Sequence, residues 1–591
     1  MDRQNVFLTF ALLAAMSQPA GAQELKLSYS AADTINSTTL RDLSGNGYDG
    51  RLVGSGISIS RKFSEQSVFI STSRLREGFV DIGESFGDVV AELDEYTIAA
   101  RIYVSTSYWN VQREGNVLWS FSNNDSIELD GGGYASFSVD DMEYSISLTD
   151  ESEKTSVSAG RNIETGGYKW VVVTCTRKES GDFIRIYEDG KCAVTGFVKN
   201  ALPELGKTKC NWIGRSPLYD VEADYSRGMI MTDFRVYDAA MSDRQIAELS
   251  EVEYSFTEPE KLLQYNFNDA NDETGTYKGS LGGSAALRKI ADVPVLDLGS
   301  GDGYFDMGTG VGDIISSVNG DFFMSLNVYI PATTVLGSPG NFFVNFGNSS
   351  SEGYMLLSAN ETEYAITQTN YAGEQLVNTG KQFPTGEWVN LIYSQHGTDG
   401  AIYLNGTMVA KGTITLLPEK LGKTSQNWLG RSPYSGDVFL KGAMFNDFRF
   451  YKGTLTTENV ADIYESAPIV TLNDAVNKDI IENFVKELTF DFGSIRTDIL
   501  LPVSFSNGVT AQWTSSDERF IKPDGKVIRP EVGEEDASVT LTATFTKGNI
   551  SKSVEYQATV LAKFSDAEAL AYDLDHLTID GSLNNLRSDL V

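Results

Sequence analysis

Two stretches of the chain are nearly identical: NWIGRSP at residues 211–217 and NWLGRSP at residues 427–433. Their neighbours recur in the same order, LGKT at 205–208 and 421–424, and DFRVY at 233–237 as DFRFY at 447–451. Chance does not place three motifs in one order at a nearly constant offset. The chain therefore holds two copies of one domain, and this duplication has to be recognised before any single motif is interpreted.

Each copy is predicted to be β-structure. Apolar residues alternate along residues 96–104, and the matching residues 322–330 keep the same parity. This alternation is typical of a strand with one buried face. Asp189-Gly190 and Asn405-Gly406 stand at matching places between such runs and predict type I′ hairpins. A short helix is expected at the end of each copy, at residues 242–249 and 456–464. Antiparallel strands with one buried and one solvent-exposed face predict a two-sheet sandwich.

The first copy resembles a known family. DLSGNGYDG at residues 42–50 is similar to the opening signature of laminin-G-like, concanavalin A-like jelly-roll domains, and DFRVY at 233–237 is similar to their closing motif. The second copy departs from the opening signature, with YKGSLGG at 277–283. The resemblance implies an all-β chain with two tandem concanavalin A-like jelly-roll sandwiches, over residues 23–252 and 253–467.

The pattern changes after Ala467. WTSSD at 513–517 and the alternating run 538–545 resemble a bacterial immunoglobulin-like module, so a small immunoglobulin-like β-sandwich is expected over residues 468–562. Such modules often act as spacers before the catalytic domain of secreted polysaccharide-degrading enzymes. Residues 577–579 and 587–590 resemble residues 488–490 and 496–499, so residues 563–591 are expected to begin a second, incomplete repeat. A glycoside hydrolase domain downstream is therefore expected as well.

The first 22 residues have the features of a signal peptide. An apolar run at residues 6–16 follows Arg3, and AGA at 20–22 suits a signal peptidase. The chain is therefore expected to be exported, to the periplasm, the cell surface or the medium. No later run is long enough to predict a transmembrane segment.

Composition excludes several classes of function. The chain has 47 Lys+Arg against 81 Asp+Glu, a net charge of −34, so phosphate repulsion argues against nucleic-acid binding. With only 2 histidines, zinc sites and Ser-His-Asp catalysis are poor hypotheses. Of the 3 cysteines, Cys175 is expected in the core, whereas pairing of Cys192 with Cys210 stays open.

The resemblance also implies a structural Ca²⁺ ion, because jelly rolls of this type often hold one between acidic loops. The alternative is that the acidic residues near Asp42 and Asn46 form turns by bonding to their own backbone. The candidate ligands are Asp33, Asp49 and Asp233 in the first copy, with Asp269 and Asp447 in the second.

Aromatic residues are the candidates for sugar binding, since rings pack on the apolar faces of sugars. Tyr108 and Trp109 lie in a loop-like stretch that the second copy does not match, which makes them the candidate platform. Four tryptophans occur in pairs at matching positions and are assigned to the core, namely Trp170, Trp388, Trp212 and Trp428. Arg215 and Arg431 are expected to hold a carboxylate or carbonyl at the rim, the alternative being a grip on uronate or sulfate.

The function predicted from the sequence is an exported, non-catalytic carbohydrate-binding and spacer assembly, the N-terminal part of a larger glycoside hydrolase, with a polysaccharide or glycan as partner. A surface adhesion protein that binds another protein is the first alternative. A self-contained sandwich glycosidase is the second, and Glu128 with Asp130 is the nearest approach to its carboxylate pair. Three glycines follow that pair and the second copy lacks it, so a turn is the preferred interpretation.

Overall fold

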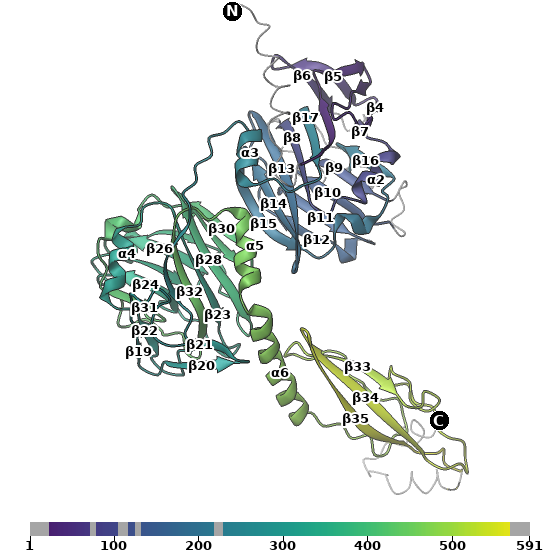
Figure 1. Ribbon diagram of the computed structural model, residues 1–591. Coiled ribbons are helices and arrows are strands. Elements are labelled where there is room, and N and C mark those ends of the chain that lie inside the picture. The colour runs from purple at the N-terminus through teal and green to yellow at the C-terminus, as the bar shows by residue number, and fades with distance from the viewer. Residues whose placement is uncertain are drawn as a thin grey trace, which may run out of the picture. The chain divides into compact units, whose positions relative to one another are not determined.

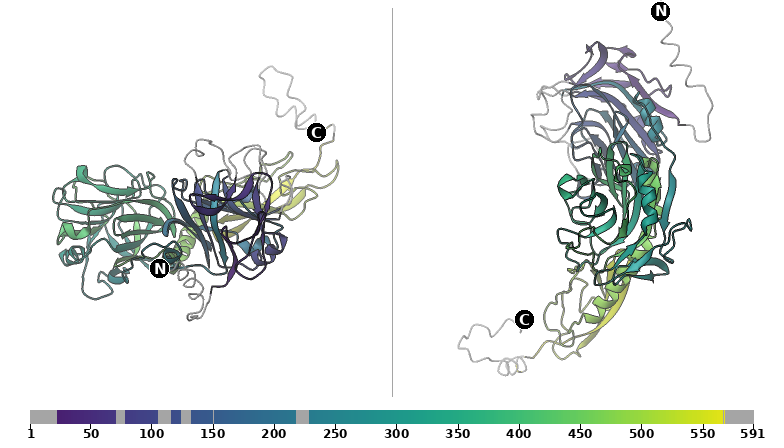
Figure 2. Two further views of the ribbon diagram at one scale, coloured as in Figure 1. Left: turned by 90° about the horizontal axis from the view of Figure 1, so that it is seen from above. Right: turned by 90° about the vertical axis from the view of Figure 1, so that its left-hand side faces the viewer.

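The computed structural model describes residues 23–70, 78–104, 116–123, 132–149, 151–217, 228–565 and 567. The chain divides after Ala467 into two compact units, apart from residues 288–295 and 386–388, which group with the second (Figure 1). The first unit holds both copies of the duplicated domain, here called jelly roll 1 (residues 23–252) and jelly roll 2 (residues 253–467). Further views show the curved, layered sheets of each jelly roll (Figure 2).

Jelly roll 1 is built from two antiparallel sheets. The first sheet has the order β15-β14-β13-β8-β17-β6-β5, with β1 on β17, and the second has the order β12-β11-β10-β9-β16-β7-β4-β3-β2. The strands are β1 (Leu25–Ser30), β2 (Thr34–Asn36), β3 (Thr39–Leu40), β4 (Gly50–Val53), β5 (Ile57–Lys62), β6 (Glu65–Ile70), β7 (Phe79–Asp81), β8 (Tyr96–Val104), β9 (Val117–Ser122), β10 (Tyr134–Ser138), β11 (Glu143–Ser147), β12 (Thr155–Ser158), β13 (Tyr168–Lys178), β14 (Gly181–Glu188), β15 (Lys191–Val198), β16 (Cys210–Ile213) and β17 (Met229–Tyr237).

Jelly roll 2 repeats this arrangement. Its first sheet has the order β20-β21-β32-β23-β28-β29-β30, with β18 on β32, and its second sheet has the order β19-β22-β31-β24-β25-β26-β27. The strands are β18 (Glu260–Tyr265), β19 (Ser280–Gly282), β20 (Ala286–Ile290), β21 (Val293–Asp297), β22 (Tyr304–Asp306), β23 (Phe322–Tyr329), β24 (Phe342–Gly347), β25 (Tyr354–Ser358), β26 (Glu363–Thr367), β27 (Gln375–Asn378), β28 (Trp388–His396), β29 (Asp399–Leu404), β30 (Thr407–Thr413), β31 (Gln426–Leu429) and β32 (Met444–Lys452).

The described helices of the two jelly rolls are short. The helices of jelly roll 1 are α2 (Gly87–Val90), α3 (Asp243–Leu249), and the 3₁₀ turns η2 (Glu84–Phe86), η3 (Glu151–Glu153) and η4 (Leu202–Leu205). Those of jelly roll 2 are α4 (Gly312–Ser316), α5 (Thr457–Ser466), η5 (Thr309–Val311), η6 (Tyr371–Gly373) and η7 (Pro418–Leu421). The expected closing helices of the two copies are thus confirmed as α3 and α5.

The predicted strand parity is also confirmed. Ile98, Ala100 and Ile102 of β8 point into the core of jelly roll 1, and Met324 and Leu326 of β23 point into the core of jelly roll 2. A fully buried aliphatic side chain of this size contributes roughly 1.5–3 kcal/mol, so each strand has a strongly determined register.

Both predicted hairpin turns have the expected backbone. The φ angles are 46° and 76° at Asp189 and Gly190, and 48° and 78° at Asn405 and Gly406. Positive φ at both central residues defines a type I′ turn. The thiol of Cys192 beyond the first of these turns is free, so Cys192 is not paired with Cys210.

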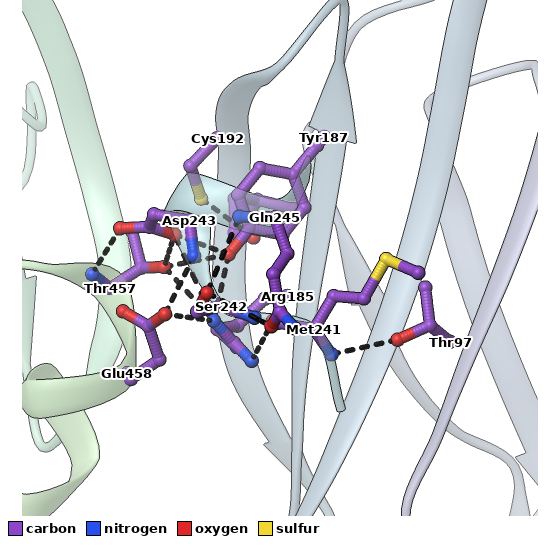
Figure 3. Close-up of polar contacts among 11 residues, drawn as sticks. Thr97, Arg185, Tyr187, Cys192, Met241, Ser242, Asp243, Gln245, Thr457 and Glu458 are labelled. Carbon is purple, nitrogen blue, oxygen red and sulfur yellow. Dashed lines mark hydrogen bonds and ion pairs between the residues drawn. The ribbon is translucent and has the colours of Figure 1, made fainter. Parts of the chain in front are cut away.

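The two jelly rolls share an interface within the first unit. Apolar side chains of both copies form one buried cluster, which includes Phe183, Tyr403 and Val460. Beside this cluster, Figure 3 shows Arg185 and Tyr187 of β14 pointing toward the first turn of α5. The copies are therefore joined by buried apolar and polar contacts.

The polar part of the interface links the first turns of α3 and α5. The backbone N–H of Thr457 donates to Asp243 at 2.8 Å, and the backbone N–H of Asp243 donates to Glu458 at 2.6 Å (Figure 3). Arg185, 1% exposed, lies 3.8 Å from Asp243 and 3.6 Å from Glu458. Backbone N–H groups at helix starts have no partner within the helix, so each copy supplies the other with a cap.

The second unit begins with a helix that the sequence analysis did not predict, α6 (Ile469–Glu487). Three strands follow, β33 (Thr510–Ser515), β34 (Ala537–Lys547) and β35 (Ile550–Val560). Trp513 and Phe545 lie in a core to which Ile481 of α6 contributes. The helix α6 buries apolar residues on one side only, so its apolar periodicity in the sequence is weaker than that of the strands.

The fold class predicted from the sequence is confirmed: two jelly-roll sandwiches and a small immunoglobulin-like β-sandwich. In the described part of the chain, no helix has the length and apolar character needed to cross a bilayer. The expected second repeat at residues 563–591 lies almost wholly outside the described residues.

Candidate functional site

A cleft of about 560 Å³ opens on the second sheet of jelly roll 2. Met355 and Leu357 of β25 point into the main core, whereas Tyr354 and Leu356 belong to a small separate cluster. Successive strand residues face opposite sides of a sheet, so the floor of the cleft is the outer face of β24–β26. Three tyrosines line it, Tyr354, Tyr371 and Tyr434, and it is called the tyrosine cleft below.

The three tyrosines hold one another in place. The rings of Tyr354 and Tyr434 meet edge to face, with centroids 5.8 Å apart, and their hydroxyl oxygens are 3.2 Å apart. The backbone N–H of Tyr371 donates to the Tyr434 hydroxyl at 3.1 Å. Tyr354 is fully buried, while the Tyr371 side chain is 72% exposed. The backbone of Tyr371 is thus bonded to a tyrosine pair, while its ring is open to solvent.

Two chain segments form a wall of the cleft by lying side by side. The backbone N–H of Asn341 donates to the Val438 carbonyl at 2.7 Å, and the N–H of Val438 donates to the Pro339 carbonyl at 3.1 Å. Gly340 between them has φ +128°, and a Cβ there would lie 2.4 Å from the Val438 nitrogen. Only glycine permits this approach, so Gly340 helps to place the segment that carries Tyr434.

Four carboxylates complete the lining. The amide nitrogen of Asn378 donates to Glu361 at 2.7 Å and lies 3.4 Å from Glu363. The Tyr354 hydroxyl donates to Glu374 at 2.6 Å, and Asp437 accepts the Ser432 hydroxyl. Each carboxylate accepts at least one hydrogen bond from the protein, which helps to fix its position in the cleft.

Burial raises the pKa of three of these carboxyl groups. The pKa of Glu363 is raised first by desolvation and then by the nearby charges of Glu374 and Glu361, against the effect of the Asn378 amide. Desolvation also raises the pKa of Glu374 and of Asp437, although a hydroxyl donor opposes the shift in each case. Carboxyl groups whose pKa is shifted by burial often cluster at functional sites, so this cleft is a candidate functional site.

The arrangement suits a polyhydroxylated ligand. A tyrosine ring packs on an apolar face, and carboxylate oxygens accept hydrogen bonds from hydroxyl groups. A concave site with an aromatic lining and few fixed polar groups is the usual form of a small-ligand site.

At the position of Tyr371, jelly roll 1 has no aromatic residue. Strand-by-strand pairing matches Tyr354 of β25 with Tyr134 of β10, because each is the first residue of its strand. At the same spacing, Tyr371 at the start of η6 corresponds to Glu151 at the start of η3. The platform of the tyrosine cleft is thus specific to jelly roll 2.

The carboxylates differ in the same way. Glu374 corresponds to Lys154 in jelly roll 1, and Glu363 corresponds to Glu143. Lys154 and Glu143 form an ion pair at 3.3 Å. A base therefore neutralises the place in jelly roll 1 where jelly roll 2 has a second acid.

Family models match both copies. Residues 81–247 and 312–461 match the concanavalin A-like lectin/glucanases superfamily, more than half of the chain. The chain belongs to the concanavalin A-like lectin/glucanase superfamily. Residues 487–563 match the atrophied bacterial Ig domain, as the resemblance implied. That match begins at the end of α6, so this helix stands between the second concanavalin A-like domain and the matched Ig residues.

Several solved structures are similar to this chain at low identity. Domain 4 of AbnA, an extracellular GH43 arabinanase from Geobacillus stearothermophilus solved with arabinotriose, is 21% identical over 35% of this chain and 100% of its own, with a TM-score of 0.30. The Ruminococcus gnavus IT-sialidase CBM40 bound to α2,3-sialyllactose is 14% identical over 27% of this chain and 85% of its own, with a TM-score of 0.22.

A third likeness covers more of the chain. A botulinum neurotoxin type C structure, described for its interaction with two ganglioside molecules, is 14% identical over 68% of this chain and 97% of its own, with a TM-score of 0.26. No curated protein showed a similar sequence. Scores of this size say nothing about what the concanavalin A-like domains of this chain bind.

Tyr108 and Trp109, the candidate platform predicted from the sequence, lie outside the described residues, and so do Glu128 and Asp130. The tyrosine cleft was not predicted, since its rings come from a strand, a 3₁₀ turn and a loop. One signal was present in the sequence: Tyr371 has no aromatic counterpart in jelly roll 1.

Two of the paired tryptophans are not in the core. Trp170 and Trp388 are buried as predicted, but Trp212 and Trp428 are half-buried on the outer faces of the second sheets. Asn427 and Leu429 on either side of Trp428 point inward, so alternation turns Trp428 outward. The assignment of Trp212 and Trp428 to the core is therefore wrong.

The two repeated arginines stack on these tryptophans. The Arg431 guanidinium lies 4.4 Å from the ring centroids of both Trp428 and Tyr304. In jelly roll 1, the Arg215 guanidinium lies 4.1 Å from Trp212 and 4.8 Å from Phe79. Cation–π contact is thus a feature that both copies share, and the expected hold on a carboxylate or carbonyl stays a prediction.

The candidate calcium ligands of jelly roll 1 have protein partners. Asp33 pairs with Arg41 at 3.2 Å, Asp49 accepts the backbone N–H of Asp42 at 2.9 Å, and Asp233 lies 3.3 Å from Arg235. Asp42 itself accepts three backbone N–H groups, from Ser28, Ser44 and Tyr48, as the turn-forming interpretation expects.

The candidates of jelly roll 2 also have partners. Asp269 accepts the backbone N–H of Asn271 at 2.7 Å, and Asp447 accepts from Gln264 at 2.6 Å and pairs with Arg449. Within the described ranges, no three acidic, His or Cys side chains are grouped so as to hold a metal ion. These residues as arranged do not form a ready Ca²⁺ site.

A larger groove, of about 1010 Å³, lies between the two jelly rolls. Among the described residues that line it, none is aromatic. Its charges are paired: Arg161 binds Glu188 at 2.8 Å, and Lys169 binds Asp189 at 2.9 Å. The groove therefore has the larger volume, but the tyrosine cleft has the chemistry for a sugar.

Proposed function

We propose that the chain is an exported, non-catalytic glycan-binding protein that holds a sugar chain in the tyrosine cleft of jelly roll 2. The observation that carries this proposal is the exposed ring of Tyr371, whose backbone is bonded to Tyr434. A backbone that is already fixed at this residue loses little conformational freedom when a ligand packs on the ring, so more of the contact energy appears as affinity.

Membership of a superfamily of lectins and glucanases supports a carbohydrate as the ligand, although a fold by itself does not settle function. Export is proposed from the apolar run at residues 6–16 and the small residues at 20–22. In this proposal the jelly rolls keep a polysaccharide-degrading partner near its substrate, and the immunoglobulin-like module is a spacer.

The proposal of a non-catalytic role rests on how the carboxylates are used. Glycoside cleavage needs one carboxyl group as an acid and another as a nucleophile or base, on opposite sides of the scissile bond. Glu361 and Glu363 share the amide of Asn378, and Glu374 holds the hydroxyl of Tyr354. Their partners favour a role in building the cleft. The alternative is a glycosidase, which the raised pKa of Glu363 would suit.

Affinity electrophoresis of the full chain in gels that contain neutral polysaccharides tests the binding. We expect retardation in at least one polysaccharide, and we expect Tyr371→Ala to weaken it about tenfold, which corresponds to about 1.4 kcal/mol. Phe63→Ala is the matched control, because Phe63 is 64% exposed and lies on jelly roll 1. Equal binding by the Tyr371→Ala variant would overturn the proposed site.

Release of reducing ends from the retarding polysaccharide tests catalysis in parallel. We expect none from the chain alone. Hydrolysis that persists in Phe63→Ala and is lost in Glu363→Gln would establish the glycosidase alternative instead.

A further inference from the structure

The charges of the tyrosine cleft are all of one sign. Four carboxylates line it, and no Lys, Arg or His is among its lining residues, all of which lie in the described range 228–565. The lining carboxylates are Glu361, Glu363, Glu374 and Asp437. The site itself is defined by its volume and its exposed ring, and the carboxylates determine which ligands it accepts.

Three of the four are close to one another. One amide nitrogen, that of Asn378, contacts both Glu361 and Glu363. Glu374, which also lines the cleft, is near enough for its charge to raise the pKa of Glu363. A negative group that entered with a ligand would therefore meet several like charges at once.

Jelly roll 1 provides an internal comparison. There the counterpart of Glu374 is Lys154, which pairs with Glu143 at 3.3 Å. The corresponding place in jelly roll 1 thus combines a base with an acid, whereas the cleft of jelly roll 2 combines acids. The two copies share the order of the seven strands that form this sheet in jelly roll 2, so the positions are comparable.

Building on the proposed function, we propose that the tyrosine cleft selects uncharged, hydroxyl-rich glycans and rejects glycans that carry sulfate or carboxylate groups. A carboxylate accepts hydrogen bonds from sugar hydroxyls, and such charge-assisted bonds are stronger than neutral ones. A carboxylate cannot donate a hydrogen bond to a sulfate or a uronate, which bind to hydrogen-bond donors or to cations.

The repulsion has a local and a general part. Charges at the floor of a partly buried cleft are screened less by salt than exposed charges are. The whole chain adds a field of the same sign, since its net charge is −34. We expect one sulfate placed on a bound sugar to weaken binding at least tenfold at physiological ionic strength.

The test compares one glycan in two forms. The full chain is screened on an array of neutral, uronate-containing and sulfated glycans, and the tightest neutral oligosaccharide is then titrated beside the same oligosaccharide after chemical sulfation. Tighter binding of the neutral form, by tenfold or more, is the expected result. Equal or tighter binding of the sulfated form would overturn the selectivity and leave the proposed function intact. Binding to no glycan on the array would overturn both.

A pair of double variants assigns the effect to the cleft. The double variant Glu361→Gln with Glu363→Gln should reduce the ratio of the affinities for the neutral and the sulfated oligosaccharide at least threefold, because two repulsive charges are removed. The control is the equivalent change in jelly roll 1, Asp141→Asn with Glu143→Gln, which removes the same net charge. An equal reduction of this affinity ratio in both double variants would show that only the net charge of the whole chain acts. That result would overturn the assignment of the selectivity to the cleft. Unfolding midpoints of both doubles check that the variants are folded.

Discussion

The carboxylate of Asp243 in jelly roll 1 accepts the first backbone N–H of α5 in jelly roll 2, from Thr457, at 2.8 Å. In return, the backbone N–H of Asp243 donates to Glu458 of α5. The closing helix of each copy is thus capped by the other copy. Tyr187 and Arg185, which contact Asp243, are both about 1% exposed.

This reciprocal capping predicts that the jelly rolls unfold together. Asp243→Ala removes the acceptor of Thr457 and leaves Arg185 with less of its counter-charge, and losing one member of a buried charged network costs about 3 kcal/mol. Calorimetry of the full chain should show the shared transition shift down and split. Asp313→Ala is the control, because Asp313 lies in the first turn of α4 and pairs with Lys423 at the surface. Its effect should stay below about 1 kcal/mol. Equal shifts in both variants would contradict the role of the network.

Selectivity in the cleft should depend on pH. Burial raises the pKa of Glu363, Glu374 and Asp437, so these groups become neutral at a higher pH than ordinary carboxyl groups, whereas a sulfate ester stays ionised. The other titratable groups facing the ligand are Glu361 and the tyrosines. Lowering the pH from 7 to 5 should therefore improve the affinity for a sulfated glycan relative to its neutral form. A constant ratio across this range would contradict the prediction.

A buried carboxyl group in jelly roll 1 makes stability depend on pH. Desolvation raises the pKa of Asp182 to about 6, although the Arg177 charge opposes this shift. The folded pKa lies above the unfolded value, so folding is favoured while the group is protonated, and stability falls as the pH rises from about 4 to above 6. A shift of about two units corresponds to about 3 kcal/mol.

Asp182→Asn should remove this part of the pH dependence. The measurement is the free energy of unfolding at pH 4.5 and pH 7 for the wild type and the variant. Asp88→Asn is the control, since Asp88 is 57% exposed and pairs with Lys207 at the surface. The prediction fails if the Asp182 and Asp88 variants lose the same amount of stability over this range.

Calcium binding stays a prediction of the sequence. If it holds, free Ca²⁺ should raise the unfolding midpoint of the full chain, because a ligand bound only by the folded state stabilises it. The ion would have to displace Arg235 from Asp233, so Asp233→Asn should reduce the gain. Midpoints that agree in Ca²⁺ and in chelator would contradict the prediction.

The sequence alone was sufficient for the fold because its strands are repeated and strongly patterned. Ile98 and Met324 hold equivalent core positions, and Gly190 and Gly406 mark equivalent turns. Such signals are local, with a period of two residues or a turn of two residues. The helix α6 was not predicted from the sequence because only a few of its residues are buried, among them Leu472 and Ile481.

The cleft could not be predicted because its parts are remote along the chain. Tyr371 and Tyr434 are 63 residues apart, and Gly340 brings a third segment beside them. Pairing of the tryptophans between copies identified their importance but not the face on which they lie. Trp428 lies on the same outer sheet face as the cleft, which only the register of β31 against β24 reveals.

The most direct test of the account is the stoichiometry of glycan binding to the full chain, measured by calorimetric titration with the tightest neutral oligosaccharide. The account predicts one site per chain, lost in Tyr371→Ala and kept in Phe63→Ala, because jelly roll 2 has the exposed ring and jelly roll 1 has Glu151 at that position. Two equal sites per chain, or one site that Tyr371→Ala leaves unchanged, would contradict it.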